Sequence, residues 1–208
     1  MTGNNQLLID LQYFPCINYF KVLSDSTYCK INLSEPYKKM SFRNRCVIVG
    51  SNGLINLSVP VEKGRNQRIP YAEVKIAYQE NWQVQHWRTI VSCYNRSPYF
   101  EYYANKLEPL FLSRWEHLVE LNQRALKIVT GILKVNMPEF IDNVHVENLV
   151  DYRDKWLPKD YDQDGESVKY VQLFEDRIGF KTNLSILDLL FMEGPNAAAL
   201  LKRRISPK

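Results

Sequence analysis

The dipeptide Asn52-Gly53 lies between two runs of alternating apolar residues, and it constrains the fold more than any other feature of the sequence. Asparagine and glycine both tolerate the positive φ that a tight turn between antiparallel strands requires. The apolar run before the dipeptide is Cys46–Val49, and the run after it is Leu54–Val61. The sequence therefore predicts a β-hairpin over these residues.

A basic stretch, Tyr37–Cys46, comes directly before this hairpin. Alternation along a strand places Arg43 and Arg45 on one face and Asn44 on the other. With Lys39, these side chains form a cluster of hydrogen-bond donors that suits a carboxylate, a phosphate or sugar hydroxyls. The alternative interpretation is a solvated strand edge, where lysine and arginine oppose aggregation.

Apolar periodicity predicts the remaining elements and the fold class. The predicted strands are Leu7–Leu11, Ser26–Leu33 and Ala72–Ala77, besides the hairpin. The predicted helices are Ile17–Leu23, one from Trp82, one from Pro98, Ser113–Leu133 and Ile186–Met192. We expect an α/β fold in one domain, 1–208, with a mixed parallel and antiparallel sheet flanked by helices.

The charges of the chain lie in blocks. Residues 1–100 carry 12 Lys and Arg against 6 Asp and Glu, whereas residues 139–176 carry 4 against 11. A nucleic-acid binder is expected to be basic along one continuous face, so we predict no nucleic-acid partner. The blocks fit either a basic pocket for an anionic ligand or two solvated faces. The acidic residues 139–170 show little periodicity and predict a long, partly irregular connection.

Composition predicts the compartment. No apolar run approaches the roughly 20 residues that span a bilayer, so we expect no membrane insertion. The polar start of the sequence lacks the basic and apolar regions of a signal peptide. The four cysteines are widely spaced, without a CxxC pair, and are interpreted as reduced and apolar. Together these features predict a cytoplasmic protein.

His86 is the histidine with the clearest context. It lies one helical turn from Trp82 and from Ile90. Imidazole titrates near neutral pH, so His86 is a candidate general acid or base. The alternative is a packed, hydrogen-bonded histidine. His117 and His145 have no supporting pattern, and the three histidines lack the spacing of metal ligands.

An acidic repeat, Asp160-x-Asp162-x-Asp164, resembles the first half of a calcium loop. Such a loop needs a glutamate at its twelfth position, where this chain has Val171. We therefore predict a solvated acidic turn and no metal site. Asp188 follows Ser185 by three residues, which predicts a helix cap. No phosphate-binding or hydrolase motif is present, so the sequence leaves any cofactor unknown.

Several groups of residues, in order along most of the chain, are similar to the WbqC-like protein family. They are Tyr13-Phe14-Pro15, Tyr19-Phe20, Tyr37-x-Lys39, Arg43-Asn44-Arg45-Cys46, Asn52-Gly53, Leu57–Val61, Trp82, His86-Trp87-Arg88, Ser97–Tyr103, Leu121-Asn122, Tyr170-x-Gln172 and Leu184–Phe191. Members of this family occur in gene clusters for O-antigen and related surface glycans. The resemblance therefore implies a transferase, either glycosyl or aminoacyl (glycine).

The leading hypothesis is a cytosolic transferase that acts on a sugar or on an activated acyl donor. His86 and Lys39 are the predicted catalytic residues. The predicted substrate-binding residues are Gln12, Tyr37, Arg43, Asn44, Arg45, Tyr170 and Gln172. The expected partner is an anionic small molecule or a sugar-linked substrate, and a homo-oligomer stays open.

The second hypothesis is a non-enzymatic binding or assembly protein with an anion- or sugar-binding pocket. The two hypotheses differ in what the fold must bring together. An enzyme is expected to gather His86 and the cations from Lys39 to Arg45 into one pocket.

Overall fold

Six strands form two separate sheets in the computed structural model, which describes residues 6–62, 69–142, 149–163 and 167–202. A four-stranded parallel sheet has the order β5-β2-β1-β6, and β3 and β4 form an antiparallel hairpin. The strands are β1 (Gln6–Leu8), β2 (Tyr28–Asn32), β3 (Arg45–Gly50), β4 (Gly53–Ser58), β5 (Glu139–Ile141) and β6 (Val150–Asp151). The expected mixed α/β fold is confirmed.

The parallel sheet is built around β1. Leu7 lies opposite Cys29 of β2 on one side and opposite Val150 of β6 on the other. Helix α1 (Ile17–Asp25) connects β1 to β2. Later in the chain, β6 returns to the opposite side of β1 from β2. In an open parallel sheet, a change of direction of this kind is where ligands bind, outside the carboxyl ends of the strands.

The predicted hairpin is confirmed, with a turn one residue earlier than the dipeptide suggests. Gly50 pairs with Gly53, so the two loop residues are Ser51 and Asn52. Only Gly53 needs the positive φ, at 125°. All of β3 after Arg45 is buried, because α7 packs against this strand.

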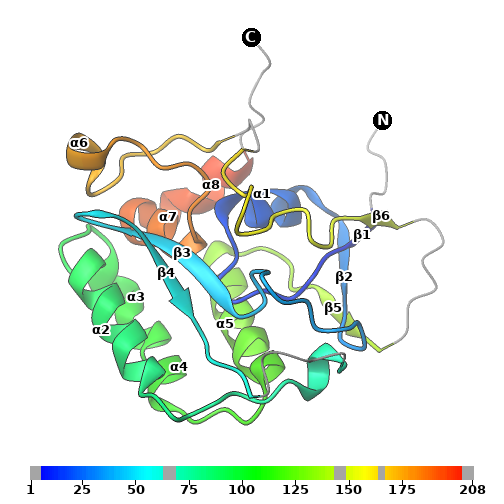
Figure 1. Ribbon diagram of the computed structural model, residues 1–208. Coiled ribbons are helices and arrows are strands. Elements are labelled where there is room, and N and C mark those ends of the chain that lie inside the picture. The colour runs from blue at the N-terminus through cyan, green and yellow to red at the C-terminus, as the bar shows by residue number, and fades with distance from the viewer. Residues whose placement is uncertain (1–5, 63–68, 143–148, 164–166, 203–208) are drawn as a thin grey trace, which may run out of the picture.

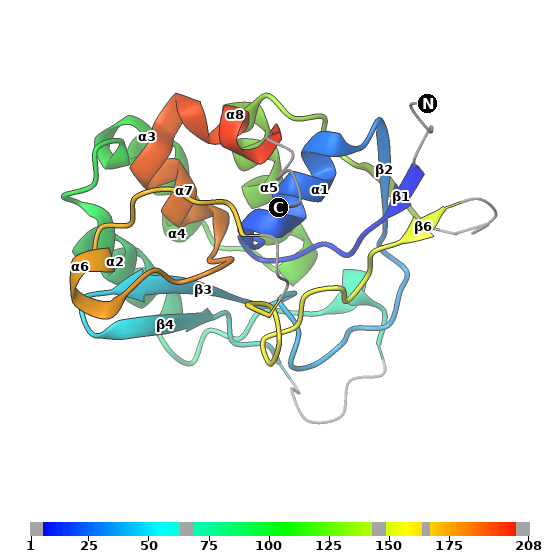
Figure 2. The same ribbon diagram turned by 90° about the horizontal axis from the view of Figure 1, so that it is seen from above.

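Helices fill the space between the two sheets and cover the hairpin. Figures 1 and 2 show the hairpin and the parallel sheet on opposite sides of the molecule, with α1 and α5 between them. The remaining helices are α2 (Trp82–Tyr94), α3 (Phe100–Leu107), α4 (Pro109–Leu112), α5 (Leu118–Leu133), α6 (Glu175–Ile178), α7 (Ile186–Glu193) and α8 (Ala197–Lys202), with short 3₁₀ turns at Tyr71–Glu73 and Gly194–Asn196. In α7 the apolar residues are buried on every side, as expected for a core helix.

Three expected elements differ from the structure. Helix α5 begins at Leu118, not at Ser113, because the Glu120 carboxylate accepts a hydrogen bond from the His117 backbone N–H. The expected strand Ala72–Ala77 is a 3₁₀ turn followed by isolated bridges. The segment 139–170 supplies β5 and β6. No helix in the described part of the chain is both long and apolar enough to cross a membrane.

Candidate functional site

Three carboxylates meet at the carboxyl edge of the parallel sheet. Asp10 follows β1, Glu35 follows β2 and Asp154 follows β6. The three strands are neighbours, so their carboxyl ends open onto one edge and these side chains converge. The backbone N–H of Asp154 donates to Asp10 Oδ1 at 3.1 Å, which ties the β1 and β6 ends together.

Arg43 lies at the centre of these carboxylates and is 2% exposed. Its Nη2 donates to Glu35 Oε1 at 2.7 Å, and its Nη1 donates to Asp154 Oδ1 at 2.7 Å. Asp10 Oδ2 lies 3.5 Å from the same Nη1. The planar guanidinium can meet several carboxylates at once, which a lysine ammonium cannot do with the same geometry.

Burial and charge oppose each other in this cluster. Burial raises the pKa of Asp10 and of Glu35, and the positive charge of Arg43 offsets the rise only in part. Burial would also raise the pKa of Asp154, but the hydrogen bond and the charge of Arg43 lower it. Asp154 is therefore the strongest acid of the three, and Glu35 is a better proton acceptor than an ordinary glutamate.

A cavity of about 430 Å³ opens beside this cluster. Its size lies in the range of small-molecule sites, roughly 300 to 1,000 Å³. Its walls carry both signs of charge, so hydroxyl or amine groups of a ligand could donate to the carboxylates while anionic groups meet the cations. The lining residues are Glu35, Pro36, Tyr37, Lys38, Arg43, Asp151, Arg153 and Asp154.

Of the predicted binding residues in the basic stretch, Tyr37 and Arg43 line this cavity, whereas Lys39, Asn44 and Arg45 do not. Asn44 Nδ2 donates to the Val59 carbonyl at 2.8 Å instead. Arg45 is the first residue of β3 and is half-buried. Buried carboxylates already neutralise Arg43, so its guanidinium is not a free cation of this cavity.

Gln12 contacts the carboxylate cluster from the protein interior. It is fully buried, and its Nε2 donates to Asp10 Oδ2 at 3.1 Å. Its Oε1 has no hydrogen-bond partner among the described residues. Gln12 thus orients a carboxylate of the cluster and does not itself line the cavity.

His86 is held apart from this cavity. The side chain is 6% exposed, its Nδ1 lies 3.0 Å from Tyr13 Oη, and its ring packs against Trp82. Burial lowers its pKa to about 4, so the ring is neutral at pH 7. The arrangement is the packed histidine of the alternative interpretation. Tyr13 links this histidine to the basic stretch, since its backbone N–H donates to the Phe42 carbonyl at 2.9 Å.

Comparisons with known proteins match most of this chain. The profile of the WbqC-like protein family matches residues 12–157, which is more than half of the 208-residue sequence. The chain belongs to the WbqC-like protein family. It is also 26% identical over 233 aligned positions to the uncharacterized protein Rv1507c of Mycobacterium tuberculosis (strain ATCC 25618 / H37Rv), covering 94% of this chain and 96% of that protein. No solved structure matches the chain.

Two predicted binding residues of the WbqC-like chain, Tyr170 and Gln172, lie beyond the matched range and form a second buried cluster around Asp188. Asp188 accepts hydrogen bonds from Tyr94 Oη at 2.8 Å and from Tyr170 Oη at 2.5 Å. Gln172 Nε2 donates to Tyr170 Oη at 3.0 Å. None of these side chains lines the cavity beside Arg43.

The expectation that the Asp188 side chain caps α7 is wrong. Ser185 Oγ accepts the capping hydrogen bond, from Leu187 N at 3.4 Å. The Asp188 carboxylate is 0% exposed and points to the two tyrosines instead. Burial raises its pKa to about 6.

Sequence reasoning missed the carboxylates of the site in this WbqC-like chain. Asp10 interrupts an otherwise apolar run, and Glu35 follows a predicted strand, so both carried a signal. Asp154, Asp151 and Arg153 come from the segment without periodicity and carried none.

The described residues contain no group of three or more His, Cys, Asp or Glu that could hold a metal ion. Asp164 of the predicted acidic turn lies outside the described residues. His145 lies outside them as well. All four cysteines are free and buried. Burial raises the pKa of Cys16 and of Cys29 to about 12 and also raises the pKa of Cys46, which disfavours the reactive thiolate.

Proposed function

We propose that this WbqC-like protein is a transferase that moves a glycosyl or an aminoacyl (glycyl) group to a polar acceptor in O-antigen or surface polysaccharide biosynthesis. Family membership supports the pathway, because the resemblance implies such gene clusters. The observation that supports transferase activity is the position and burial of the Glu35 carboxylate. It is 7% exposed, it borders the cavity beside Arg43, and burial raises its pKa.

Glu35 is assigned the role of general base. It removes the proton from an acceptor hydroxyl or amine as that group attacks the transferred carbon of the donor. The bond from this carbon to the leaving group breaks, and the leaving group departs with the electron pair. Lys38 and Arg153 line the same cavity and stabilise the negative charge that develops on the donor. The proton stays on Glu35, beside the Arg43 guanidinium.

The other predicted residues take supporting roles in this proposal. Tyr37 offers a ring and a hydroxyl to the substrate from the cavity wall. Gln12 and Arg43 hold the carboxylates in place. Lys39 follows Lys38 in the same loop and remains a predicted catalytic cation. His86 stays a predicted proton acceptor, and Glu35 is preferred in this proposal because it lines the cavity, whereas His86 does not.

A ligand screen with variants tests the proposal. Purified protein is tested for thermal stabilisation by nucleotide sugars, acyl-coenzyme A compounds and aminoacyl donors. A ligand at a hundred times its Kd adds about 2.7 kcal/mol to the free energy of unfolding. We expect Lys38→Ala and Arg153→Ala to lose the stabilisation, and Glu35→Gln to keep binding but lose turnover by roughly 10²- to 10⁴-fold. Glu101→Gln, on the exposed side of α3, is the matched control.

The alternative is a non-enzymatic protein that binds a sugar or an anion in the same cavity. The observation that favours it is the charge balance of the site, since Arg43 is already matched by carboxylates. Binding without turnover in the wild type supports this alternative. A folded protein that binds none of the probes contradicts both functions.

A further inference from the structure

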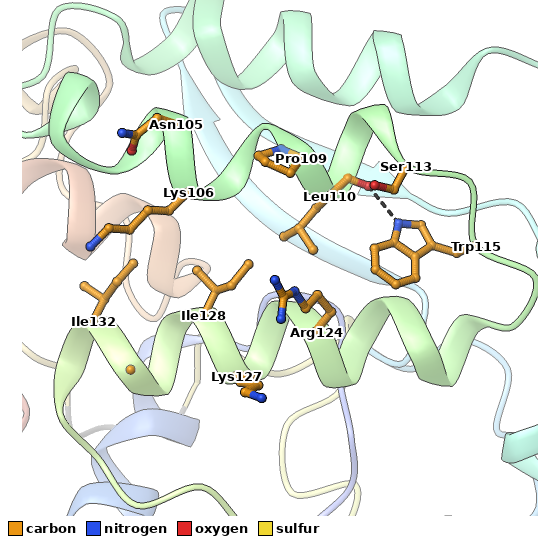
Figure 3. A pocket seen from close by; sticks show the side chains of 11 residues that line it. Asn105, Lys106, Pro109, Leu110, Ser113, Trp115, Arg124, Lys127, Ile128 and Ile132 are labelled. Carbon is orange, nitrogen blue, oxygen red and sulfur yellow. Dashed lines mark hydrogen bonds between the residues drawn. The ribbon is translucent and has the colours of Figure 1, made fainter.

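A second hollow, of about 760 Å³, lies between α5 on one side and α3 and α4 on the other (Figure 3). It shares no lining residue with the cavity beside Arg43. Its floor is apolar. Figure 3 shows Leu110 pointing toward α5, and Ile128 and Ile132 pointing back from α5 toward it.

The rim of this groove is basic. Lys106 of α3 and Arg124 and Lys127 of α5 are exposed lining residues. None of these three side chains has an ion pair or a hydrogen bond within the part of the chain that the structure describes. Among the described lining residues there is no carboxylate. Figure 3 shows Lys106 on the α3 side, extending toward Ile132, and Arg124 on the α5 side, pointing across the hollow toward Leu110.

Gly131 breaks the wall that α5 forms. Glycine inside a helix is less stable than alanine, so a packing reason for it is expected. Here a Cβ added to Gly131 would meet no heavy atom within 4 Å, so no neighbour in the described chain requires the glycine. Because Gly131 lines the groove, its missing side chain leaves room for a ligand against the helix backbone.

Trp115 closes one end of the groove in a fixed position. Its Nε1 donates to the Leu110 carbonyl at 2.9 Å, as Figure 3 shows. A flat, rigid indole at the end of an apolar floor offers a contact surface for an alkyl chain.

We propose that this groove binds a free single-chain amphiphile, with an unbranched alkyl chain and a carboxylate or phosphate head group. The alkyl chain lies on the floor made by the half-buried Ile128 and Ile132, and the head group meets the unpaired cations Lys106 and Arg124. The charge complementarity selects an anion. A bilayer surface is a poorer fit, because the apolar floor lies between α5 on one side and α3 and α4 on the other, and a flat surface would meet the exposed rim first.

Titration calorimetry with dodecyl phosphate, kept below its critical micelle concentration, tests the proposal. Full burial of one methylene lowers the Kd about fourfold. In an open groove a methylene is only partly buried, and we expect about half of that gain in binding free energy. We therefore expect the Kd to fall by roughly tenfold from octyl to dodecyl phosphate. Inorganic phosphate and dodecyltrimethylammonium, each lacking one half of the ligand, should not bind measurably.

Variants that reverse a charge on the rim, or that fill the space beside Gly131, show whether the ligand binds in this groove. Arg124→Glu and Lys106→Glu should each weaken binding of dodecyl phosphate by about tenfold or more. Lys159→Glu, at a lysine that is 75% exposed and outside the groove, should leave the Kd unchanged. Gly131→Leu should abolish binding while the protein stays folded, because leucine favours a helix more than glycine does.

Three results would overturn the proposal: a Kd that ignores chain length, a Kd that is the same in Arg124→Glu and wild type, or binding to phosphatidylglycerol vesicles without binding to monomeric dodecyl phosphate. If Gly131→Leu fails to fold, the surface variants Arg124→Glu and Lys106→Glu still decide the question. The groove lies outside the proposed transferase site, so either function can fail without the other.

Discussion

Glu35 Oε1 lies 2.7 Å from Arg43 Nη2, and the two side chains are 7% and 2% exposed. This ion pair joins the end of the parallel sheet to the basic stretch before the hairpin. It also explains why a cluster of cations in the sequence does not become an open anion site. The buried Arg43 neutralises carboxylates that the fold has already brought together.

Arg43→Ala should therefore destabilise the protein. Removal of one partner of a buried ion pair costs about 3 to 5 kcal/mol, because it leaves Asp10 and Glu35 as uncompensated buried charges. For a protein of this size, the expected fall in Tm is roughly 6 to 20 °C, measured by thermal unfolding at pH 7. The deficit should shrink as the pH falls, because burial raises the pKa of both carboxylates and a protonated carboxyl carries no uncompensated charge.

The matched control for Arg43→Ala is Arg96→Ala. Arg96 is exposed and has no ion pair within the described residues, so its free energy of unfolding should change by about 0.5 kcal/mol or less. An unchanged Tm in Arg43→Ala, together with lost ligand binding, would show that Arg43 is free to serve a ligand.

Asp188 should make the protein less stable as the pH rises. Its pKa of about 6 lies above the ordinary 3.8, because it is buried. The folded protein thus binds this proton more tightly than the unfolded chain does. The contribution, about 3 kcal/mol, is present below pH 4 and lost as the pH rises through 6. In Asp188→Asn, this decrease in the free energy of unfolding with rising pH should be absent. Urea titrations at a series of pH values measure it.

Asp25→Asn is the control for the Asp188 experiment. Asp25 is exposed at the end of α1, so the pH dependence of this variant should run parallel to that of the wild type. Parallel curves for Asp188→Asn as well would mean that folding does not shift the pKa of Asp188.

Local sequence signals predicted the hairpin and several helices. They could not predict which strands pair when the strands lie far apart in the sequence. Asn52-Gly53 marks the turn because only local backbone geometry is involved. Strands β5 and β6 have three and two residues, too few for any periodicity to show. The site depends on those strands. Arg43 and Asp154 are 111 residues apart, and they meet only because β6 pairs with β1.

The same limit applies to the start of α5. Apolar spacing continues upstream of the helix through Trp115, so periodicity alone extends the helix too far. The boundary is set by one hydrogen bond, from the His117 backbone to the Glu120 side chain. Ser113 and Glu116 have the spacing and residue types that a capping box requires. Serine is also a more common N-cap residue than histidine, so the local signal favours the wrong start.

Gly194 and Gly131 should respond to alanine in opposite directions. Gly194 has a φ of 52°, and an added Cβ would lie 2.4 Å from the Tyr99 ring. Left-handed backbone and overpacking together predict a loss of roughly 2 to 4 kcal/mol for Gly194→Ala. Gly131→Ala has open space around it and should gain about 0.5 to 1 kcal/mol. Thermal unfolding of both variants checks the pair, and a stabilised Gly194→Ala would contradict the placement of Tyr99.

His86 should stay neutral down to acidic pH, and this decides its part in catalysis. Burial lowers its pKa to about 4. The folded protein binds this proton less tightly than the unfolded chain, whose histidine titrates near 6.5. The resulting stability, about 3 kcal/mol, is present above pH 6.5 and lost as the pH falls through 4. The NMR shift of the His86 ring should therefore stay constant from pH 8 to about 5.5. Titration near 6.5 would mean that the ring reaches solvent, and His86 would then replace Glu35 as the preferred proton acceptor.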